Sequence, residues 1–169
     1  ISVENIFLLF MAYLIGALPF SILAGKLIKG IDIREYGSGN AGATNTFRVL
    51  GKKAGIPVLI LDVFKGLAAV SLIAYTSYQV NTEIYLNLQL VFGVAAVLGH
   101  IFPVYAGFRG GKGVATLLGF MIGVFPLAAL LSITVFVICL VLSKYVSFSS
   151  IISSIFFPIG VYYFSETLF

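Results

Sequence analysis

The sequence is poor in charge, and this shortage decides the class of protein. Only 9% of its 169 residues are charged, whereas a soluble domain carries about 25%. Hydrophobic residues make up 60% of the chain, and the mean hydropathy is +1.13. So few charges cannot cover a surface that faces water, which excludes an ordinary soluble domain. The composition indicates a chain whose main solvent is lipid.

Two further scarce residue types exclude particular kinds of site. The single cysteine, Cys139, lies in an apolar run, which excludes a disulfide framework and a cysteine-based metal site. The single histidine, His100, has no Asp, Glu or Cys near it in the sequence, so it predicts neither a metal site nor a catalytic triad. For His100 a hydrogen-bonded packing role is favoured over a role in lining a site.

Apolar runs separated by Gly, Pro or charge predict transmembrane helices, each near the ~20 residues that cross a bilayer. The first three runs cover residues 6–27, 56–78 and 84–105. The run 114–142 is too long for one comfortable span and contains Pro126, so it is one kinked helix or two short ones. The last run covers residues 149–164.

The distribution of basic residues favours two short helices in the run 114–142. Two crossings there place every basic residue except Lys65 on one side, which the positive-inside rule makes cytoplasmic. We therefore predict an all-α polytopic membrane protein with six transmembrane helices and the N-terminus outside. Residues 1–169 form a single transmembrane domain in this prediction. The chain also has the look of a fragment, since it starts at Ile1 and ends directly after an apolar run.

The first candidate site is the sequence GSGNAGATN at residues 37–45, with Arg48 one helical turn further on. Three glycines in six residues allow the backbone N–H groups to point inward and bind an anion. The side chains of Ser38, Asn40, Thr44 and Asn45 add neutral hydrogen-bond donors, and Arg48 adds a cation. The alternative is a flexible hairpin between two membrane helices. The predicted phosphate-binding residues are Gly37, Ser38, Gly39, Asn40, Gly42, Thr44, Asn45 and Arg48.

The second candidate site is the sequence GFRGGKG at residues 107–113, which leads directly into an apolar helix. A cationic, glycine-rich turn at a helix N-terminus favours phosphate. It is not a Walker A loop, because Ala106 holds the first position and Gly113 follows the lysine. The alternative is a positive-inside anchor with a tight turn. The predicted phosphate-binding residues are Gly110, Gly111, Lys112 and Gly113.

Several other polar residues lie within or beside the apolar runs. Asp62 and Lys65, spaced i,i+3, can share one helix face; a functional pair and a structural clamp are both open. Ser147 and Ser150 begin the last run and could cap it or line the same cytoplasmic pocket. The loops contain no convincing general base or activated nucleophile, so a transfer reaction here would rest on positioning anions and stabilising developing charge.

Four stretches together resemble one family. Residues 37–48, residues 61–66, Gly99-His100 with Pro103, and residues 107–116 occur in the order and spacing seen in bacterial acyl-phosphate:glycerol-3-phosphate acyltransferases, the PlsY family. The resemblance covers nearly the whole chain. It implies a small integral membrane enzyme that moves a fatty acyl group from acyl phosphate to the 1-hydroxyl of glycerol 3-phosphate. The products are lysophosphatidic acid, a phospholipid precursor, and phosphate.

The resemblance also implies roles for individual residues. Ser38, Arg48 and Lys112 match catalytic positions, and Asn40 matches a phosphate-binding one. Asp62, Lys65, His100, Thr116, Ser147 and Ser150 become supporting residues. The family uses neither a metal nor an organic cofactor, and substrate phosphate takes the hydroxyl proton. It carries a seventh helix with an active-site His and Asn, which this sequence lacks.

The implied partners are the two substrates, membrane lipids and the enzyme that makes acyl phosphate, with no nucleic acid. The implied location is the bacterial inner membrane, with the site on the cytoplasmic face. A membrane transporter for a phosphate-containing solute is the alternative, since it would use the same loops and the pair of buried charges. A non-catalytic scaffold would leave the loop composition unexplained.

Overall fold

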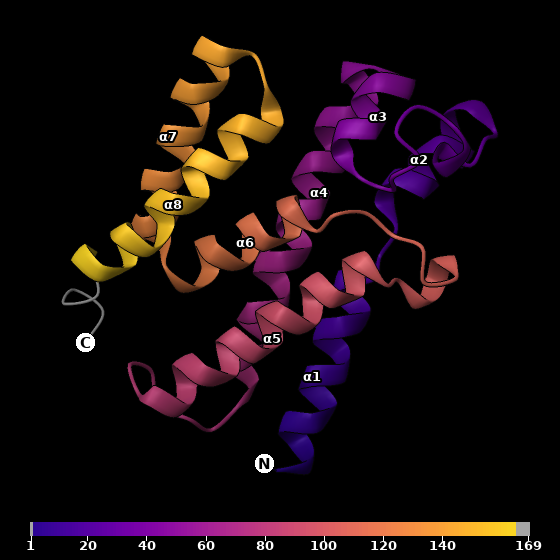
Figure 1. Cartoon of the computed structure of the whole chain (residues 1–169). Helices are drawn as coiled ribbons and strands as arrows, with labels where there is room; N and C mark the ends of the chain where they lie inside the picture. Colours follow the sequence, from indigo (N-terminus) through magenta and orange to yellow (C-terminus); the bar gives the residue numbers. More distant parts are fainter. Residues whose placement is uncertain (1, 165–169) are drawn as a thin grey trace. The chain divides into compact units, whose positions relative to one another are not determined.

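The computed structural model describes residues 2–164, which form helices joined by turns and two longer loops (Figure 1). No strand occurs in that range, so the all-α prediction is confirmed. The α-helices are α1 (Val3–Gly16), α2 (Phe20–Lys29), α3 (Ala43–Leu50), α4 (Lys52–Ser71), α5 (Glu83–Ile101), α6 (Val114–Val124), α7 (Pro126–Ser143) and α8 (Val146–Phe164). Short 3-10 turns are η1 (Ile33–Glu35), η2 (Leu72–Tyr75) and η3 (Val104–Ala106).

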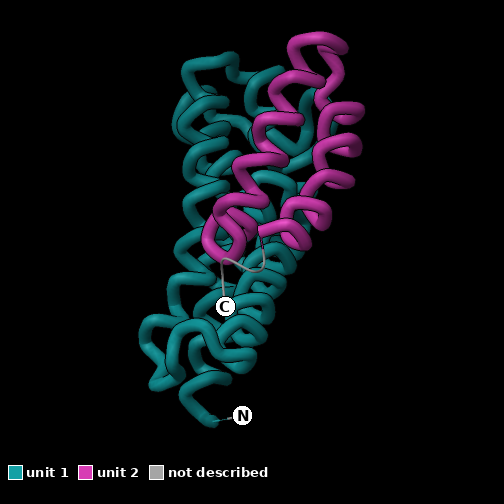
Figure 2. Tube along the Cα trace, turned by 90° about the vertical axis from the view of Figure 1, so that its left-hand side faces the viewer, with its two compact units in different colours: residues 1–120 teal, residues 121–169 magenta. Residues whose placement is uncertain are grey.

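The chain divides into two compact units, residues 1–120 and residues 121–169 (Figure 2). The first unit contains both glycine-rich loops. In the second unit α7 and α8 pack side by side as a helical hairpin (Figure 1). Within that hairpin Gly160 lies against Ala128, and the rings of Phe125 and Phe157 meet edge to face with centroids 6.1 Å apart.

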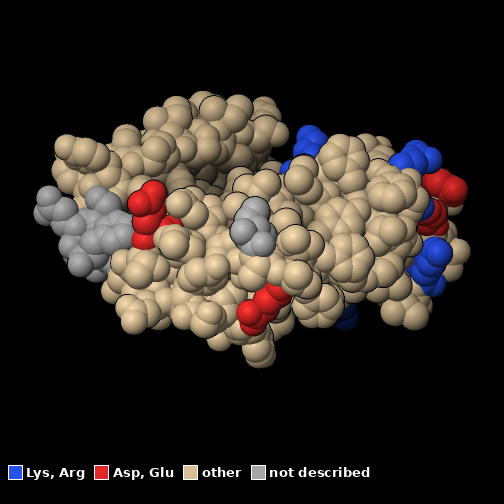
Figure 3. All heavy atoms as spheres, turned by 90° about the horizontal axis from the view of Figure 1, so that it is seen from below, with Lys and Arg blue, Asp and Glu red and all other residues tan. Residues whose placement is uncertain are grey.

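Five segments of the described chain are long and apolar enough to cross a membrane: Val3–Lys29, Lys52–Tyr75, Glu83–Ala106, Pro126–Ser143 and Val146–Phe164. Their outward faces carry exposed hydrophobic side chains such as Phe10, Phe64 and Val141. The face shown in Figure 3 is almost entirely uncharged, with Lys and Arg gathered at one side of the view. These are surfaces suited to lipid, as the composition predicts.

The run 114–142 is divided at the predicted proline. Helix α6 ends at Val124 and α7 begins at Pro126, because proline has no N–H to continue the hydrogen-bonding pattern but fits a first helical turn. Helix α6 has 11 residues, or about 17 Å of helical rise, against a hydrocarbon thickness of about 30 Å. The count of six spans and the outside N-terminus therefore stay predictions.

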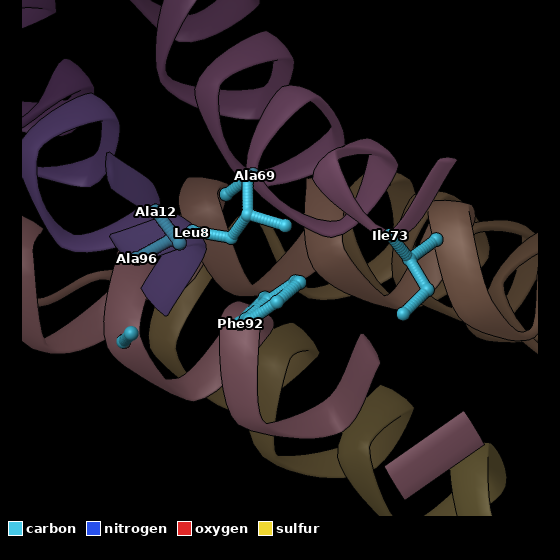
Figure 4. Close-up of a cluster of buried hydrophobic side chains, with 7 residues drawn as sticks. Leu8, Ala12, Ala69, Ile73, Phe92 and Ala96 are labelled. Atoms are coloured by element: carbon cyan, nitrogen blue, oxygen red, sulfur yellow. The ribbon is translucent and has the colours of Figure 1, made fainter. Parts of the chain in front are cut away.

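The core of the first unit lies where α1, α4 and α5 pack against one another (Figures 1 and 4). Phe92 of α5 is fully buried there, and the side chains around it are mostly small. Small residues let membrane helices approach closely enough for dispersion contacts, which must replace the hydrophobic effect in lipid. The buried cluster consists of Leu8, Ala12, Ala69, Ile73, Phe92, Ala95 and Ala96.

Glycines set the closest helix approaches. A Cβ on Gly66 of α4 would strike the carbonyl oxygen of Thr116 in α6, and one on Gly119 would strike that of Val63. In the same way Gly16 of α1 has no room for a Cβ beside Ala96 of α5. Backbone therefore touches backbone at the α1–α5 and α4–α6 crossings.

The first apolar run is broken, which the sequence analysis did not foresee. Helix α1 ends at Gly16 and α2 starts at Phe20, with Pro19 at its N-cap. The side chain of Lys65 in α4 donates a 2.9 Å hydrogen bond to the carbonyl of Leu18 inside the break. A side chain that satisfies freed backbone groups allows a break within a membrane segment.

Candidate functional site

Asn45 organises the first glycine-rich loop from within. Its Oδ1 accepts a 2.8 Å bond from the N–H of Ser38, and its Nδ2 donates to the carbonyls of Ile33 and Tyr36. The amide is 1% exposed. The sequence analysis placed Asn45 among the phosphate-binding residues, but its side-chain donors are both used on the loop's own backbone. The amide therefore shapes the loop, and its side chain offers no donor to a ligand.

The loop's glycines permit the turns that bring Asn45 and Ser38 together. Gly37 and Gly39 have φ of +62° and +72°, values that favour glycine because it lacks a Cβ. A Cβ on Gly37 would also collide with the Asn45 oxygen. Ser38 itself is exposed, and Asn40 turns its amide nitrogen to the Ser38 carbonyl at 3.3 Å.

The loop ends at the N-terminus of α3. Gly42 is the N-cap and supplies no side-chain hydrogen bond, so the N–H groups of Ala43 and Thr44, the first two of this eight-residue helix, have no side-chain cap. Thr44 and Arg48 lie one turn apart on α3 and are both exposed. This end of the helix combines open N–H groups, a hydroxyl and a guanidinium, which is a favourable environment for an anion.

The second glycine-rich loop packs tightly against the end of α5. The N–H groups of Gly110 and Gly111 donate to the carbonyls of Ile101 and His100, at 3.1 and 3.2 Å. A Cβ on Gly110 would strike the His100 carbonyl, and one on Gly111 would strike the His100 ring. Both glycines were predicted among the phosphate-binding residues, but their N–H groups donate to the last carbonyls of α5.

Lys112 follows this packed segment and is exposed. Gly113 has a φ of +76°, and α6 starts at the next residue. Lys112 therefore stands at the N-terminus of α6, where its charge and the helix dipole both favour an anion. The packed glycines fix the place from which the lysine side chain extends.

The structure brings the two loops together. The N–H of Ala41 in the first loop lies 3.4 Å from the carbonyl of Gly110 in the second. Arg34 of η1 adds a stronger link, since its Nη1 donates to the carbonyls of Ala106 and Arg109 at 2.7 and 3.1 Å. Segments 72 and 75 residues apart are therefore in direct contact.

Arg34 is held by an ion pair that the sequence analysis did not identify. Its Nη2 lies 2.6 Å from Oδ2 of Asp32, and its Nε also contacts the carboxylate. The hydrogen bond from Arg34 lowers the pKa of Asp32 from its ordinary value to about 2. The same bond raises the pKa of Arg34. The sequence does contain one sign of this ion pair. An acid and an arginine stand two positions apart, as Asp32 and Arg34, with two further residues between Arg34 and the glycine-rich motif.

A buried polar cluster lies beneath the loops. Lys65 Nζ is 2.9 Å from Asp62 Oδ1, and both side chains are 2% exposed. The Oδ1 of Asp62 also lies 3.7 Å from Nδ1 of His100, which is in turn 3.1 Å from the hydroxyl of Thr116. The predicted Asp62–Lys65 pair is therefore present. Only the tertiary structure gives His100 its acidic neighbour.

A small cavity connects this cluster to the loops. It is lined by the α1–α2 break, by Asp62, Lys65 and His100, and by Ala41 and Gly110 from the two loops. The helix break, the buried ion pair and the contact between loops therefore surround one space.

Ser147 and Ser150 belong to the second unit, in the first turns of α8. Ser147 is exposed, and Ser150 donates to the carbonyl of Val146 at 2.9 Å, a bond within its own helix. Their predicted supporting role stays a prediction.

Within residues 2–164 no group of three or more His, Cys, Asp or Glu side chains could hold a metal ion. The charged groups at the loops are mostly cationic. The arrangement can bind and orient anions and can stabilise negative charge as it develops on a reacting oxygen.

Comparison with known proteins places the chain in a family of enzymes that act on a phosphate-bearing substrate. A family model described as glycerol-3-phosphate acyltransferase matches residues 6–169. Curated relatives named glycerol-3-phosphate acyltransferase include one from Chlorobaculum parvum, 51% identical over 88% of this chain and 66% of the relative. Another, from Chlorobium phaeobacteroides, is 50% identical over 91% of this chain and 68% of the relative. The chain spans about two thirds of the length of these relatives.

A solved structure shares the fold. The chain is similar to PlsY (YgiH), an integral membrane glycerol 3-phosphate acyltransferase, in its glycerol 3-phosphate form. The TM-score is 0.81 and the identity 43%, over 94% of this chain and 76% of that one. The form of the same protein with lysophosphatidic acid gives a TM-score of 0.79 and 42% identity, with the same coverage.

Proposed function

Because this chain belongs to the glycerol-3-phosphate acyltransferase family, we propose that its protein transfers a fatty acyl group from acyl phosphate to the 1-hydroxyl of glycerol 3-phosphate. The products are lysophosphatidic acid and inorganic phosphate. Residues 1–169 belong to one transmembrane acyltransferase domain in this proposal. The reaction would supply phospholipid biosynthesis.

The observation that carries the proposal is the junction of the two glycine-rich loops. It joins the loop that leads into α3, the helix of Arg48, to the loop that leads through Lys112 into α6. Two substrates that each bear a phosphate need two such anion sites near one another. Arg48 and Lys112 are the cations we assign to them, with Ser38, Asn40 and Thr44 as neutral donors.

The proposed acyl transfer requires the protein mainly to position the two substrates. The hydroxyl oxygen of glycerol 3-phosphate attacks the carbonyl carbon of the mixed anhydride, and a C–O bond forms. The bond from that carbon to the phosphate oxygen then breaks, and phosphate leaves with the electron pair. The hydroxyl proton passes to a phosphate oxygen of a substrate. Arg48 and Lys112 stabilise the charge that develops, and fixed orientation lowers the entropic part of the barrier.

The location of the protein follows from its helices and its charges. The chain is an integral membrane protein by its apolar helices and its structural relatives. We infer a bacterial inner membrane, with the N-terminus outside and both loops on the cytoplasmic side, where the basic residues gather. Acyl phosphate would reach the site from the enzyme that makes it.

The test is direct. Purified full-length protein in lipid is supplied with palmitoyl phosphate and labelled glycerol 3-phosphate, and lysophosphatidate is measured with released phosphate. Equal amounts of the two products support acyl transfer. The observation that favours the transporter alternative is the break between α1 and α2, because interrupted transmembrane helices are common in transporters. Uptake of labelled glycerol 3-phosphate into liposomes, without either product, would reject the enzyme in favour of the transporter.

A further inference from the structure

Arg34 makes all of its polar contacts within the protein. One edge of the guanidinium, Nε and Nη2, faces the carboxylate of Asp32 at 2.6 to 3.2 Å. The remaining nitrogen, Nη1, donates to the carbonyls of Ala106 and Arg109. The planar fork is thus divided between Asp32, which anchors it from just before its own 3-10 turn, and the second loop, which it holds.

The segment that Arg34 holds has an unusual backbone conformation. Gly107 and Phe108 both have left-handed backbone, with φ of +64° and +59°. This conformation is costly for a residue as bulky as Phe108. Phe108 is also exposed, so burial of its ring contributes little to holding the turn. The two carbonyls that accept from Arg34 flank this left-handed pair, and Lys112 follows three residues after the second.

We propose that Arg34 is a positioning residue of the acyl-transfer site. It holds the second loop against the first, so that the two phosphate-binding sites keep their positions relative to each other. The inference rests on the proposed function. Arg34 acts through the carbonyls of Ala106 and Arg109, and Asp32 orients its guanidinium. Arg48 and Lys112 remain the groups that touch substrate.

A positioning role predicts a particular kinetic pattern. If the junction of the loops loosens, both anion sites are disturbed, so the KM values for acyl phosphate and glycerol 3-phosphate rise together. A residue that bound one phosphate directly would change one KM. A variant that is merely less folded would lower the apparent kcat by reducing the active fraction, and would leave both KM values unchanged.

The experiment compares Arg34→Ala, Arg34→Lys and Asp32→Asn in the full-length protein in lipid, with Glu35→Gln as the matched control. Glu35 lies in the same 3-10 turn, is exposed, and makes no side-chain bond to residues 2–164. We expect Arg34→Ala to raise both KM values by on the order of tenfold, the size of one lost charge-assisted hydrogen bond. Arg34→Lys gives an intermediate rise, because an ammonium lacks the fork. Glu35→Gln leaves both values within about twofold of wild type.

Asp32→Asn distinguishes the two roles by the sign of its effect, even if Arg34→Ala does not fold. Removing the anchor of a positioning arginine raises both KM values. Removing a negative charge beside an arginine that binds phosphate itself would lower KM. A rise in both supports the inference; a fall, a change in one KM alone, or unchanged values overturns it.

Binding of glycerol 3-phosphate to the same variants is measured by calorimetry. If wild-type protein binds it but forms no lysophosphatidate, the proposed function fails. The order of affinities among the Arg34 and Asp32 variants then still decides whether Arg34 positions the site: weaker binding in Arg34→Ala and Asp32→Asn supports that role, and wild-type binding rejects it.

Discussion

The ammonium nitrogen of Lys65 lies 2.9 Å from the carbonyl oxygen of Leu18, 47 positions earlier in the chain. The same nitrogen lies 2.9 Å from the Asp62 carboxylate. One buried ammonium therefore contacts both an acid one turn earlier in α4 and a backbone carbonyl in the break between α1 and α2. Of the two readings left open for this pair, the structural clamp is the one that these contacts favour.

Replacement of Lys65 by Met tests the clamp. It leaves the buried Asp62 carboxylate without its cation and removes one of the two donors to the Leu18 carbonyl, so we expect a loss of about 3–5 kcal/mol in the free energy of unfolding. Denaturation in detergent micelles measures it. The exposed Lys53→Met is the control. Adding Asp62→Leu to Lys65→Met should recover part of the loss, because no charge is then left buried; a double variant no more stable than the single one would contradict this account.

The α4–α6 crossing predicts sensitivity to one methyl group. Gly66→Ala places a Cβ against the Thr116 carbonyl, and overpacking of this kind costs about 1–3 kcal/mol. Thermal unfolding in micelles checks it. Lys53→Ala, an exposed change on the same helix, is the stability control. Equal melting temperatures for the two variants would show that the crossing tolerates separation.

Loss of the two proposed phosphate-binding cations should stop turnover without unfolding the protein. Arg48→Ala and Lys112→Ala each remove an exposed charge, and each should cost at least about 1.5–3 kcal/mol of substrate or transition-state binding. Rates of lysophosphatidate formation and melting temperatures are measured together, with Lys53→Ala as control. Near-normal rates in both variants would remove the assigned phosphate sites.

The Asp32–Arg34 pair predicts a pH dependence of stability. The pKa of Asp32 is depressed in the folded protein, so the unfolded chain takes up its proton first as pH falls. The stabilisation is complete above the ordinary pKa of about 4 and is lost as pH falls towards about 2. Melting temperatures from about pH 5 to about pH 2 should therefore fall further for wild type than for Asp32→Asn. Glu35→Gln, which keeps the pair, should follow wild type; equal slopes for wild type and Asp32→Asn would contradict the assignment.

Much of the architecture could be predicted from local patterns. The apolar runs gave the long helices because a membrane segment must satisfy its backbone within itself. Pro126 gave the division of the run 114–142, and the i,i+3 spacing gave the Asp62–Lys65 pair. The break at Pro19 was missed, since uninterrupted hydropathy conceals a kink that a distant lysine makes tolerable.

The candidate site was predicted in its residue types more successfully than in its contacts. The sequence predicts Asn45, Gly110 and Gly111 as phosphate-binding residues. Their donors instead bond to nearby carbonyls, because a loop with few apolar side chains must use its polar groups to define its own shape. Arg34 was counted only as a cytoplasmic charge, since no local pattern shows which carbonyls it reaches.

The sequence by itself determined that this is a helical membrane protein with glycine-rich, basic loops, because hydropathy, charge and glycine spacing act over a few residues. Only the tertiary structure decided what those loops do to one another. Arg34 meets Ala106 and Arg109, His100 meets Asp62, and Lys65 meets Leu18 across 38 to 75 positions. Such contacts depend on how close the helices pack, which the glycines at their crossings permit and which no short stretch of sequence encodes.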